Sequence, residues 1–197
     1  IATLIGARLG HVIFYQPELF SQDIISVFMP FKTVPEFKFT GFQGLASHGA
    51  AIGIIIAMYF YSKKILKKPI LWVLDRIVIA VASGAVFVRI GNFINSEIIG
   101  KATNSDYGVV FKQLGEDFPR HPAQLYESSC YIFVFLILWY LYWKTKKSKQ
   151  MGYLLGAFLV MLWTVRFFVE FVKEAQVDER AEWALNTGQW LSIPFVI

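Results

Sequence analysis

The sequence has few of the residues that a soluble or disulfide-stabilised protein needs. Charged residues make up 17% of its 197 residues, against about 25% in ordinary soluble domains. Its single cysteine, Cys130, excludes an intrachain disulfide framework. Intrinsic disorder requires low hydrophobicity and high net charge, so an apolar content of 56% excludes that class as well.

Several functional motifs are also missing. The sequence has no Gly-rich phosphate loop, no serine nucleophile elbow and no residues at metal-ligand spacing. We therefore expect neither a cofactor nor a metal. The formal net charge is +5, which would favour nucleic acid in a soluble protein. In an apolar chain, orientation within a membrane explains the positive residues better, and no nucleic-acid partner is expected.

Long apolar stretches are what the sequence does contain. A bilayer core of about 30 Å is crossed by roughly 20 apolar residues in a helix. The candidate stretches are residues 1–16, 46–62, 71–93, 122–143, 152–172 and 187–197. They predict an all-α fold, a polytopic helical membrane protein with about six to seven transmembrane helices. We expect residues 1–197 to form one transmembrane domain, cut from a longer polypeptide at both ends.

Two short lysine-rich connections predict the orientation. They contain Lys63, Lys64, Lys67 and Lys68, and Lys144, Lys146, Lys147 and Lys149. Because two crossings separate them, both lie on one side, and the positive-inside rule makes that side cytoplasmic. The outward connections then include insertions at about 17–45 and 98–121. The second holds turn signals at 104–106 and at Gly115, around a strand-like run at 107–111.

A few ionisable residues lie within or at the edge of the apolar stretches. They are Arg8, His48, Arg89, Glu127, Arg166 and Glu170. A charge in hydrocarbon costs on the order of 2.5–3.5 kcal/mol, so such residues face a bundle interior or a watery cavity and are functional candidates. With the predicted orientation, all except Arg8 converge at the depth of the outer leaflet.

Structural explanations stand beside the functional ones. Arg166 and Glu170 are spaced i,i+4 and could neutralise each other. Arg89 could extend to the outer headgroups, although Asn92, Asn95 and Glu97 beside it form a dense polar cluster. His48 could be a satisfied interior histidine. Four further features also have structural explanations: His121-Pro122 could be only a helix start, Cys130 is explained by packing, Ala80 with Gly84 by helix packing, and Arg8 could be structural.

Two arginines and a histidine at one depth predict a specific chemistry. The guanidinium fork suits an anionic oxygen group such as phosphate, and phospholipid headgroups carry phosphates at this depth. A histidine supplies a proton acceptor near neutral pH. The residues alone therefore predict a site for an anionic lipid headgroup, with general-base chemistry as one possibility.

Six sequence blocks, in order, resemble the prolipoprotein diacylglyceryl transferase family. The blocks are GARLG at 6–10, SHG at 47–49, RIGNFINSE at 89–97, RHPAQLYE at 120–127, RFFVEF at 166–171 and GQWLSIP at 188–194. The resemblance implies a multi-pass enzyme of the bacterial inner membrane, with its active site toward the outer leaflet. Its implied substrates are phosphatidylglycerol, a membrane lipid, and the lipobox cysteine of a preprolipoprotein. Transfer of the diacylglyceryl group would release glycerol phosphate.

The resemblance also implies roles for individual residues. It places the catalytic residues at His48, Arg89 and Arg166. It places substrate-binding positions at Asn92, Asn95, Glu97, Gly100, Arg120, His121, Gln124, Tyr126, Glu127 and Glu170. Departures from the family pattern are Ala50 and Ser96, where glycine is common, Leu162 in place of a tyrosine, and Lys173 in place of an arginine.

Two other functional classes remain open from the sequence. A transporter that binds or flips anionic phospholipids would use the same arginines without covalent chemistry. A structural subunit of a membrane complex would pair its polar residues internally. A covalent product formed from phosphatidylglycerol and a lipobox peptide would separate the enzyme from both.

Overall fold

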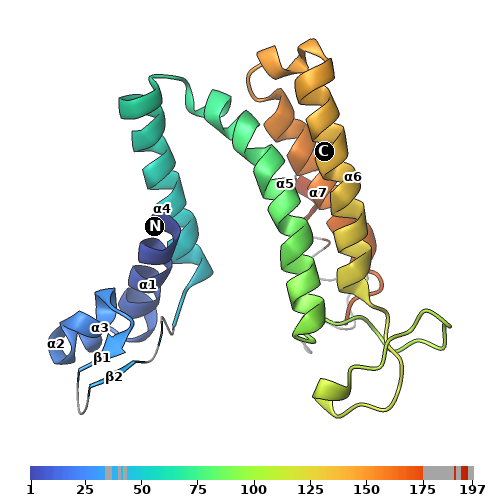
Figure 1. Cartoon of the computed structure of the whole chain (residues 1–197), viewed down its shortest axis with the longest axis horizontal. Helices are drawn as coiled ribbons and strands as arrows, with labels where there is room; N and C mark the ends of the chain where they lie inside the picture. Colours follow the sequence, from blue (N-terminus) through green and yellow to red (C-terminus); the bar gives the residue numbers. More distant parts are fainter. Residues whose placement is uncertain (34–36, 40, 42–43, 175–188, 190–191, 195–197) are drawn as a thin grey trace. The chain divides into compact units, whose positions relative to one another are not determined.

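The computed structural model describes residues 1–33, 37–39, 41, 44–174, 189 and 192–194, and it is predominantly helical (Figure 1). Contacts divide the chain into two compact units, unit 1 (Ile1–Ile70) and unit 2 (Leu71–Ile197). The elements of unit 1 are α1 (Ala2–Tyr15), α2 (Leu19–Gln22), α3 (Ile24–Phe28), β1 (Phe31–Lys32), β2 (Lys38–Phe39), α4 (Ser47–Phe60) and a π-helix at Tyr61–Leu66. Unit 2 contains α5 (Ile70–Ile94), α6 (Ala123–Lys144), α7 (Tyr153–Val169) and 3₁₀ turns at Lys112–Leu114 and Lys146–Lys149. The first residue of α5, Ile70, is the last residue of unit 1.

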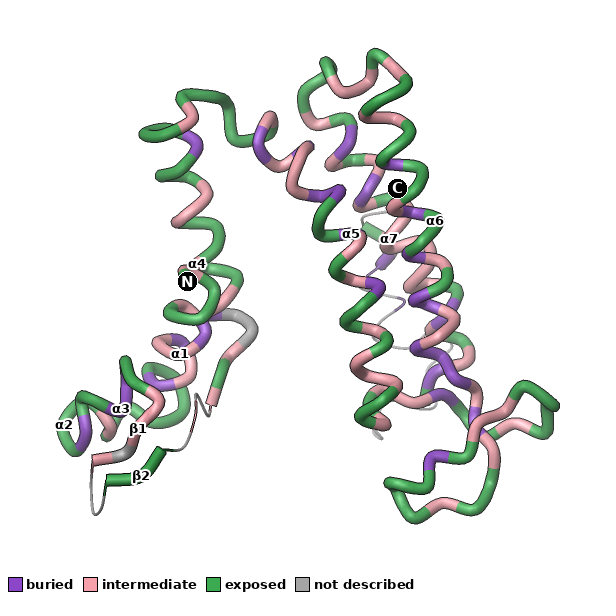
Figure 2. Tube along the Cα trace, viewed as in Figure 1, coloured by how far each residue is buried: buried purple, intermediate pink, exposed green. Residues whose placement is uncertain are grey.

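Three helical stretches in the described part of the chain are long and apolar enough to cross a membrane. They are Gly49–Leu66, Ile70–Ile94 and Ala123–Lys144. At most 28% of each stretch is buried inside the protein, and the exposed faces of these helices are visible in Figure 2. An apolar surface left outside the protein core suits contact with lipid. These helices confirm the polytopic helical class.

The predicted stretches agree with the helices to within a few residues, with two exceptions. α7 ends at Val169, so it is shorter than the predicted 152–172, and Glu170 follows its last turn. The stretch 187–197 lies mostly outside the described residues. Local sequence explains the ends of α4 and α7: the π-helix after α4 stops at Lys67, which has a left-handed φ of 51°, and Pro69 follows. α7 begins after Gly152, which has φ 82°.

In unit 1, α1 and α4 cross at four glycines. A Cβ added at Gly6 would lie 2.4 Å from the carbonyl oxygen of Gly49, and one at Gly10 would lie 2.6 Å from the Gly49 Cα. A Cβ on Gly53 would meet the carbonyl oxygen of Ala2 at 2.6 Å. Each helix therefore carries a G-x-x-x-G face that brings the two backbones together.

This glycine crossing corrects one sequence prediction. Ala80 and Gly84 had the same small-residue spacing and were predicted to pack against a helix. Among the described residues, nothing lies within 4 Å of a Cβ built on Gly84, and the residue is exposed. Spacing of small residues is necessary for close packing, but a partner helix must also approach that face, and no described helix of unit 2 does so at Gly84.

Arg8 attaches the short elements of unit 1 to α1. Its guanidinium donates to the backbone carbonyls of Ser26 at 2.8 Å, Val27 at 3.3 Å and Gly44 at 3.4 Å. Asp23 in turn accepts from the Ser26 amide at the start of α3. Arg8 thus has the structural role that the sequence indicated.

The core of unit 2 is built from one face each of α5, α6 and α7. It comprises Val78, Ile79, Ala82, Val86, Tyr131, Val134, Leu138, Leu154 and Phe158. At one end of this core, the Asp75 carboxylate accepts from the backbone amides of Gly152, at 2.6 Å, and Leu155, at 2.8 Å. Asp75 is 1% exposed. A side chain of α5 therefore caps the N-terminus of α7.

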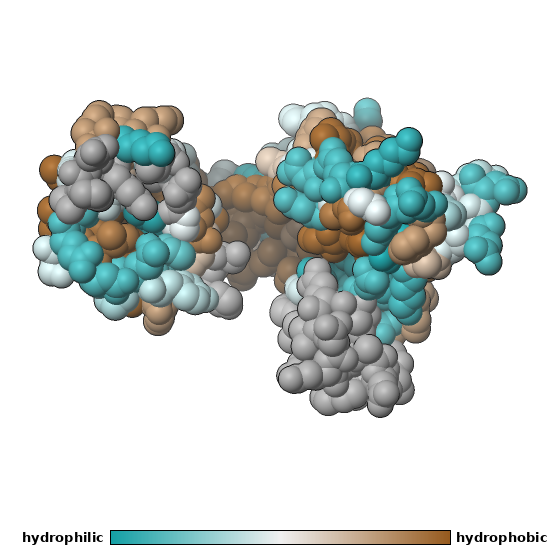
Figure 3. Space-filling view, turned by 90° about the horizontal axis from the view of Figure 1, so that it is seen from below, coloured by the Kyte–Doolittle hydropathy of each residue, from teal (hydrophilic) through white to brown (hydrophobic). Residues whose placement is uncertain are grey.

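The connection between α5 and α6 lies at the opposite end of unit 2. Figure 3, viewed from below, shows hydrophilic residues over this end, with hydrophobic residues behind them. The turns predicted at 104–106 and at Gly115 are present. The strand predicted at 107–111 is wrong, because only Val109 forms a bridge, with Arg120. The turn before Gly108 and the 3₁₀ turn that starts at Lys112 leave no room for a longer ladder.

Candidate functional site

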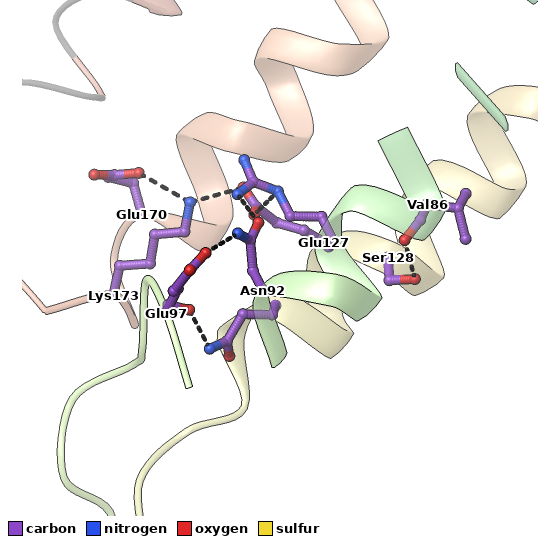
Figure 4. Close-up of polar contacts among 9 residues, drawn as sticks. Val86, Asn92, Glu97, Glu127, Ser128, Glu170 and Lys173 are labelled. Carbon is purple, nitrogen blue, oxygen red and sulfur yellow. Dashed lines mark hydrogen bonds and ion pairs between the residues drawn. The ribbon is translucent and has the colours of Figure 1, made fainter. Parts of the chain in front are cut away.

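A network of charged side chains lies where α5 ends, α6 begins and α7 ends, with Glu127 at its centre (Figure 4). The Glu127 carboxylate is fully buried. One of its oxygens lies 2.6 Å from Arg89 Nε, and the other lies 2.8 Å from Lys173 Nζ. Burying a carboxylate is costly unless it is paired, and here two cations on two other segments compensate it.

The polar residues that follow Arg89 extend this network. Arg89 Nη1 donates to Asn92 Oδ1 at 3.3 Å, and Asn92 Nδ2 donates to Glu97 Oε2 at 2.8 Å. Gln124, which is fully buried, donates to the Glu97 backbone carbonyl at 2.6 Å. Figure 4 shows Asn92 between Glu97 and Glu127. Arg89 is thus held from both sides, and its guanidinium has a fixed direction.

The backbone that leaves α5 is strained. Ser96 has φ 56° and Ile98 has φ 53°, both in the left-handed region that glycine favours. The glycine expected by the family pattern at position 96 would adopt this conformation without a steric penalty. A β-branched residue such as Ile98 seldom does so, and strained backbone of this kind is concentrated at functional sites.

Arg166 has a different environment from Arg89. It lies in the last turn of α7 with its guanidinium 5.3 Å from the centre of the Trp163 ring. Among the described residues no carboxylate forms an ion pair with it, and its buried Nε has no hydrogen-bond partner. Arg166, Arg89 and Glu127 all lie close enough to the buried Tyr131 to act electrostatically on its hydroxyl. The two arginines therefore share one region of unit 2.

The proposed i,i+4 pair of Arg166 with Glu170 does not form in the described part of the chain. Glu170 instead lies 3.6 Å from Lys173 Nζ. Glu170 is the C-cap of α7 and its amide still donates to the Arg166 carbonyl at 3.0 Å, so the backbone keeps the i,i+4 geometry and the carboxylate pairs with Lys173 instead.

Arg120 anchors the α5–α6 connection. Its guanidinium makes two bonds to the Glu116 carboxylate, at 2.5 and 2.6 Å, and a third to the Gly100 carbonyl at 3.2 Å. The hydrogen bonds from Arg120 lower the pKa of Glu116, and the bonds to Glu116 raise that of Arg120. Gly100 packs so closely that a Cβ would lie 2.3 Å from the His121 carbonyl oxygen.

The other predicted site residues are distributed over both units. His121 Nδ1 lies 3.3 Å from the Tyr126 hydroxyl, so these two interact with each other. Asn95 is exposed at the end of α5. His48 lies in the first turn of α4 in unit 1, and its side chain is outside the described part of the structure. Within the described residues, no three His, Cys, Asp or Glu side chains form a possible metal site.

Comparison with known proteins identifies the family of this chain. The family described as prolipoprotein diacylglyceryl transferase matches residues 1–197. The chain belongs to this family. The phosphatidylglycerol–prolipoprotein diacylglyceryl transferase of Bacteroides fragilis is 46% identical over 196 residues, which are 98% of this chain and 70% of the relative. The enzyme of that name from Tolumonas auensis is 40% identical over 197 residues, 100% of this chain and 72% of the relative. The enzyme of that name from Chloroherpeton thalassium is 43% identical over 198 aligned residues, which cover 99% of this chain and 69% of the relative.

Sequence reasoning did not assign a site role to two residues of this member of the diacylglyceryl transferase family. Lys173 is 4% exposed and bridges Glu127 and Glu170, and Tyr131 is buried near both arginines. The spacing of each residue from a candidate site residue could have indicated a role. Tyr131 lies four residues after Glu127, on the same face of α6. Lys173 lies three residues after Glu170.

Proposed function

We propose that this chain transfers the diacylglyceryl group of phosphatidylglycerol to the lipobox cysteine thiol of preprolipoproteins. This is the first step of lipoprotein maturation. Family membership and the names of its relatives support the activity. The structural observation that supports it most is Arg166, a guanidinium without a carboxylate partner among the described residues, near an Arg89 that is already held in place.

The proposed reaction is a displacement at a glycerol carbon. The thiol proton passes to a base, the sulfur–carbon bond forms, and the carbon–oxygen bond to phosphate breaks. The electron pair of that bond leaves with the phosphate oxygen, so the second product is glycerol phosphate. A free thiol has a pKa near 8.5, so a base is needed near neutral pH. His48 is our proposed base.

The two arginines have complementary roles in this proposal. Arg166 binds the phosphate and stabilises the charge that develops on it as the bond breaks. Arg89 contributes a second guanidinium whose orientation depends on Glu127 and Asn92. Because Glu127 is fully buried and forms an ion pair through each of its oxygens, it acts by positioning Arg89. Asn95 and Glu97, which are exposed, are proposed to contact the headgroup.

We further propose the placement in the membrane. The site faces the outer leaflet of the bacterial inner membrane, and both lysine-rich connections face the cytoplasm. Support comes from unit 2, where Asp75, near the start of α5, bonds to Gly152, just after the second lysine-rich connection. The charged network lies at the other ends of these helices. With the remaining apolar stretches, about six to seven transmembrane helices are proposed for the family chain.

The deciding experiment mixes purified protein, phosphatidylglycerol and a synthetic lipobox peptide, and weighs the peptide by mass spectrometry. We expect a mass increase equal to one diacylglyceryl group in place of the thiol hydrogen. Arg166→Gln should lower the rate by about a hundredfold or more, as removal of a charge-stabilising group does. A transporter without chemistry would leave the peptide mass unchanged.

A matched control is Lys112→Gln, which removes one positive charge from an exposed position on the α5–α6 connection. It should transfer at the wild-type rate. Equal rates for Arg166→Gln and the wild type would contradict the phosphate role of Arg166, and an unmodified peptide with wild-type protein would contradict the transferase itself.

A further inference from the structure

A groove of unit 2 lies away from the charged network. It has a volume of about 430 Å³ and runs between the halves of α5 and α6 nearest the lysine-rich connection of residues 144–149. Its walls are mostly apolar and aromatic, and include Ile79, Ala80, Ser83, Phe135, Trp139 and Trp143. The one charged residue that lines it is Arg76.

Arg76 reaches back toward the start of α5. Its Nη1 donates to the Trp72 carbonyl at 2.7 Å, and its guanidinium carbon lies 3.5 Å from the centre of the Trp72 ring. The Tyr142 ring is 5.8 Å away on α6. A long cationic side chain that extends toward a helix end, among tryptophan and tyrosine, is typical of the boundary between hydrocarbon and headgroups.

The charge of Arg76 has no protein counterion among the described residues, none of whose carboxylates forms an ion pair with it. Its neighbour Asp75 faces away and caps α7 through Gly152 and Leu155. The nearby connection adds four more cations, Lys144, Lys146, Lys147 and Lys149. This end of unit 2 therefore gathers five cations that form no ion pair with the described carboxylates.

We propose that this groove binds one anionic phospholipid of the cytoplasmic leaflet. The lipid phosphate lies at Arg76, and an acyl chain lies along Phe135 and Trp139. Basic pockets between helices on the cytoplasmic side bind anionic headgroups elsewhere. The site is distinct from the proposed transfer site, because thirteen residues of α5 separate Arg76 from Arg89, a rise of about 20 Å. The assignment to the cytoplasmic leaflet rests on the proposed membrane orientation, whereas the proposed lipid binding rests on the groove and Arg76.

The test is photo-crosslinking in phosphatidylcholine nanodiscs. The probes are phosphatidylglycerol and phosphatidylcholine with the same diazirine on one acyl chain, and no peptide substrate is added. Crosslinks are mapped by peptide mass spectrometry. We expect segment 135–143 of the wild-type protein to react about fivefold more with the anionic probe, the effect of one cation near the lipid surface. Arg76→Gln should abolish this preference, and Arg76→Lys should retain most of it.

Lys101→Gln is the matched control, since it removes one exposed cation at the opposite end of unit 2 and should leave the preference unchanged. Equal labelling of the wild type by both probes would overturn the proposal, as would a preference that persists in Arg76→Gln. Absence of labelling by either probe would also overturn it, because another segment of the protein would then fill the groove. The wild-type comparison decides the matter even if Arg76→Gln does not fold. Loss of transfer activity in the separate peptide assay would not affect this result.

Discussion

Arg89 and Arg166 lie in the same region of unit 2, but their surroundings differ in charge. Glu127 neutralises Arg89 across 2.6 Å, while the described residues give Arg166 no such partner. A neutralised arginine still orients donors toward a ligand, whereas an arginine without a counterion contributes its full charge. We therefore propose orientation as the role of the first residue and charge stabilisation as the role of the second.

At Glu127, the conservative change to glutamine should be severe. An amide cannot neutralise Arg89 and Lys173, so Glu127→Gln leaves two cations without their buried carboxylate. Loss of one partner from a buried ion pair costs about 3–5 kcal/mol. Thermal unfolding in detergent, followed by circular dichroism, should show a clear decrease in melting temperature. Asp117→Asn, an exposed carboxylate in the same unit, is the control; equal melting temperatures for the two variants would refute the argument.

The pair of Glu116 and Arg120 predicts a pH dependence. Hydrogen bonds from Arg120 lower the pKa of Glu116 below its ordinary value, which is about 4.3. The stabilisation is therefore fully present above that ordinary value and is lost as the pH falls through the lower folded-state pKa. Glu116→Gln should reduce the melting temperature at about pH 6 and approach the wild type at about pH 3. A difference that stays constant over this range would argue against the pair.

Individual residues show how far the sequence could lead. An unpaired charge in hydrocarbon has a high free-energy cost, and this argument singled out Arg89, Glu127 and Glu170 as functional candidates. All three lie at one end of the helices of unit 2. The pairings were less accessible. Arg166 and Glu170 had ideal helical spacing, but the Glu170 carboxylate pairs with Lys173 instead. One buried partner of Glu127 is Lys173, which lies 46 residues away in the sequence. No local pattern predicts such a contact.

At the scale of whole elements, the crossing of α1 and α4 requires the absence of a side chain at Gly49. A Cβ at this position would lie 2.2 Å from the Gly6 carbonyl oxygen, so Gly49→Ala must separate the two helices. Because Gly49 follows the proposed base His48, we expect a loss of both stability and transfer. Gly84→Ala is the matched control, since its Cβ meets nothing. It should be neutral or slightly stabilising in the same melting and transfer measurements. If both variants behaved alike, the crossing would not have the role described.

The helices were predictable from apolar length alone, whereas their contacts and the irregular connection were not. Apolar length defines a spanning helix within a few residues, and α5 and α6 match the predicted stretches closely. Glycine spacing gave the wrong face at Gly84 because a sequence does not specify which helix lies opposite. At 107–111, strand propensity was overridden by turns on both sides.

At the scale of the whole molecule, the proposed orientation can be tested with engineered cysteines. Cys130→Ser provides a background without thiols. In it, Ser105→Cys on the α5–α6 connection should react with an impermeant maleimide in intact spheroplasts. Ser148→Cys, between lysines of the α6–α7 connection, should react only after permeabilisation. The opposite pattern would reverse the orientation and place the charged network on the cytoplasmic side.

The cap that Asp75 gives to α7 has a consequence for biogenesis. Asp75 leaves the ribosome 77 residues before the Gly152 amide that it binds, which is about 4–15 s at ordinary rates of synthesis. During that interval the carboxylate must remain solvated near the membrane surface. α7 lacks this partner for its first amides until it packs against α5. Its arrival then removes Asp75 from water and fixes the two helices at one end, so the last turn of α7, with Arg166, is positioned by an event at the opposite end of that helix.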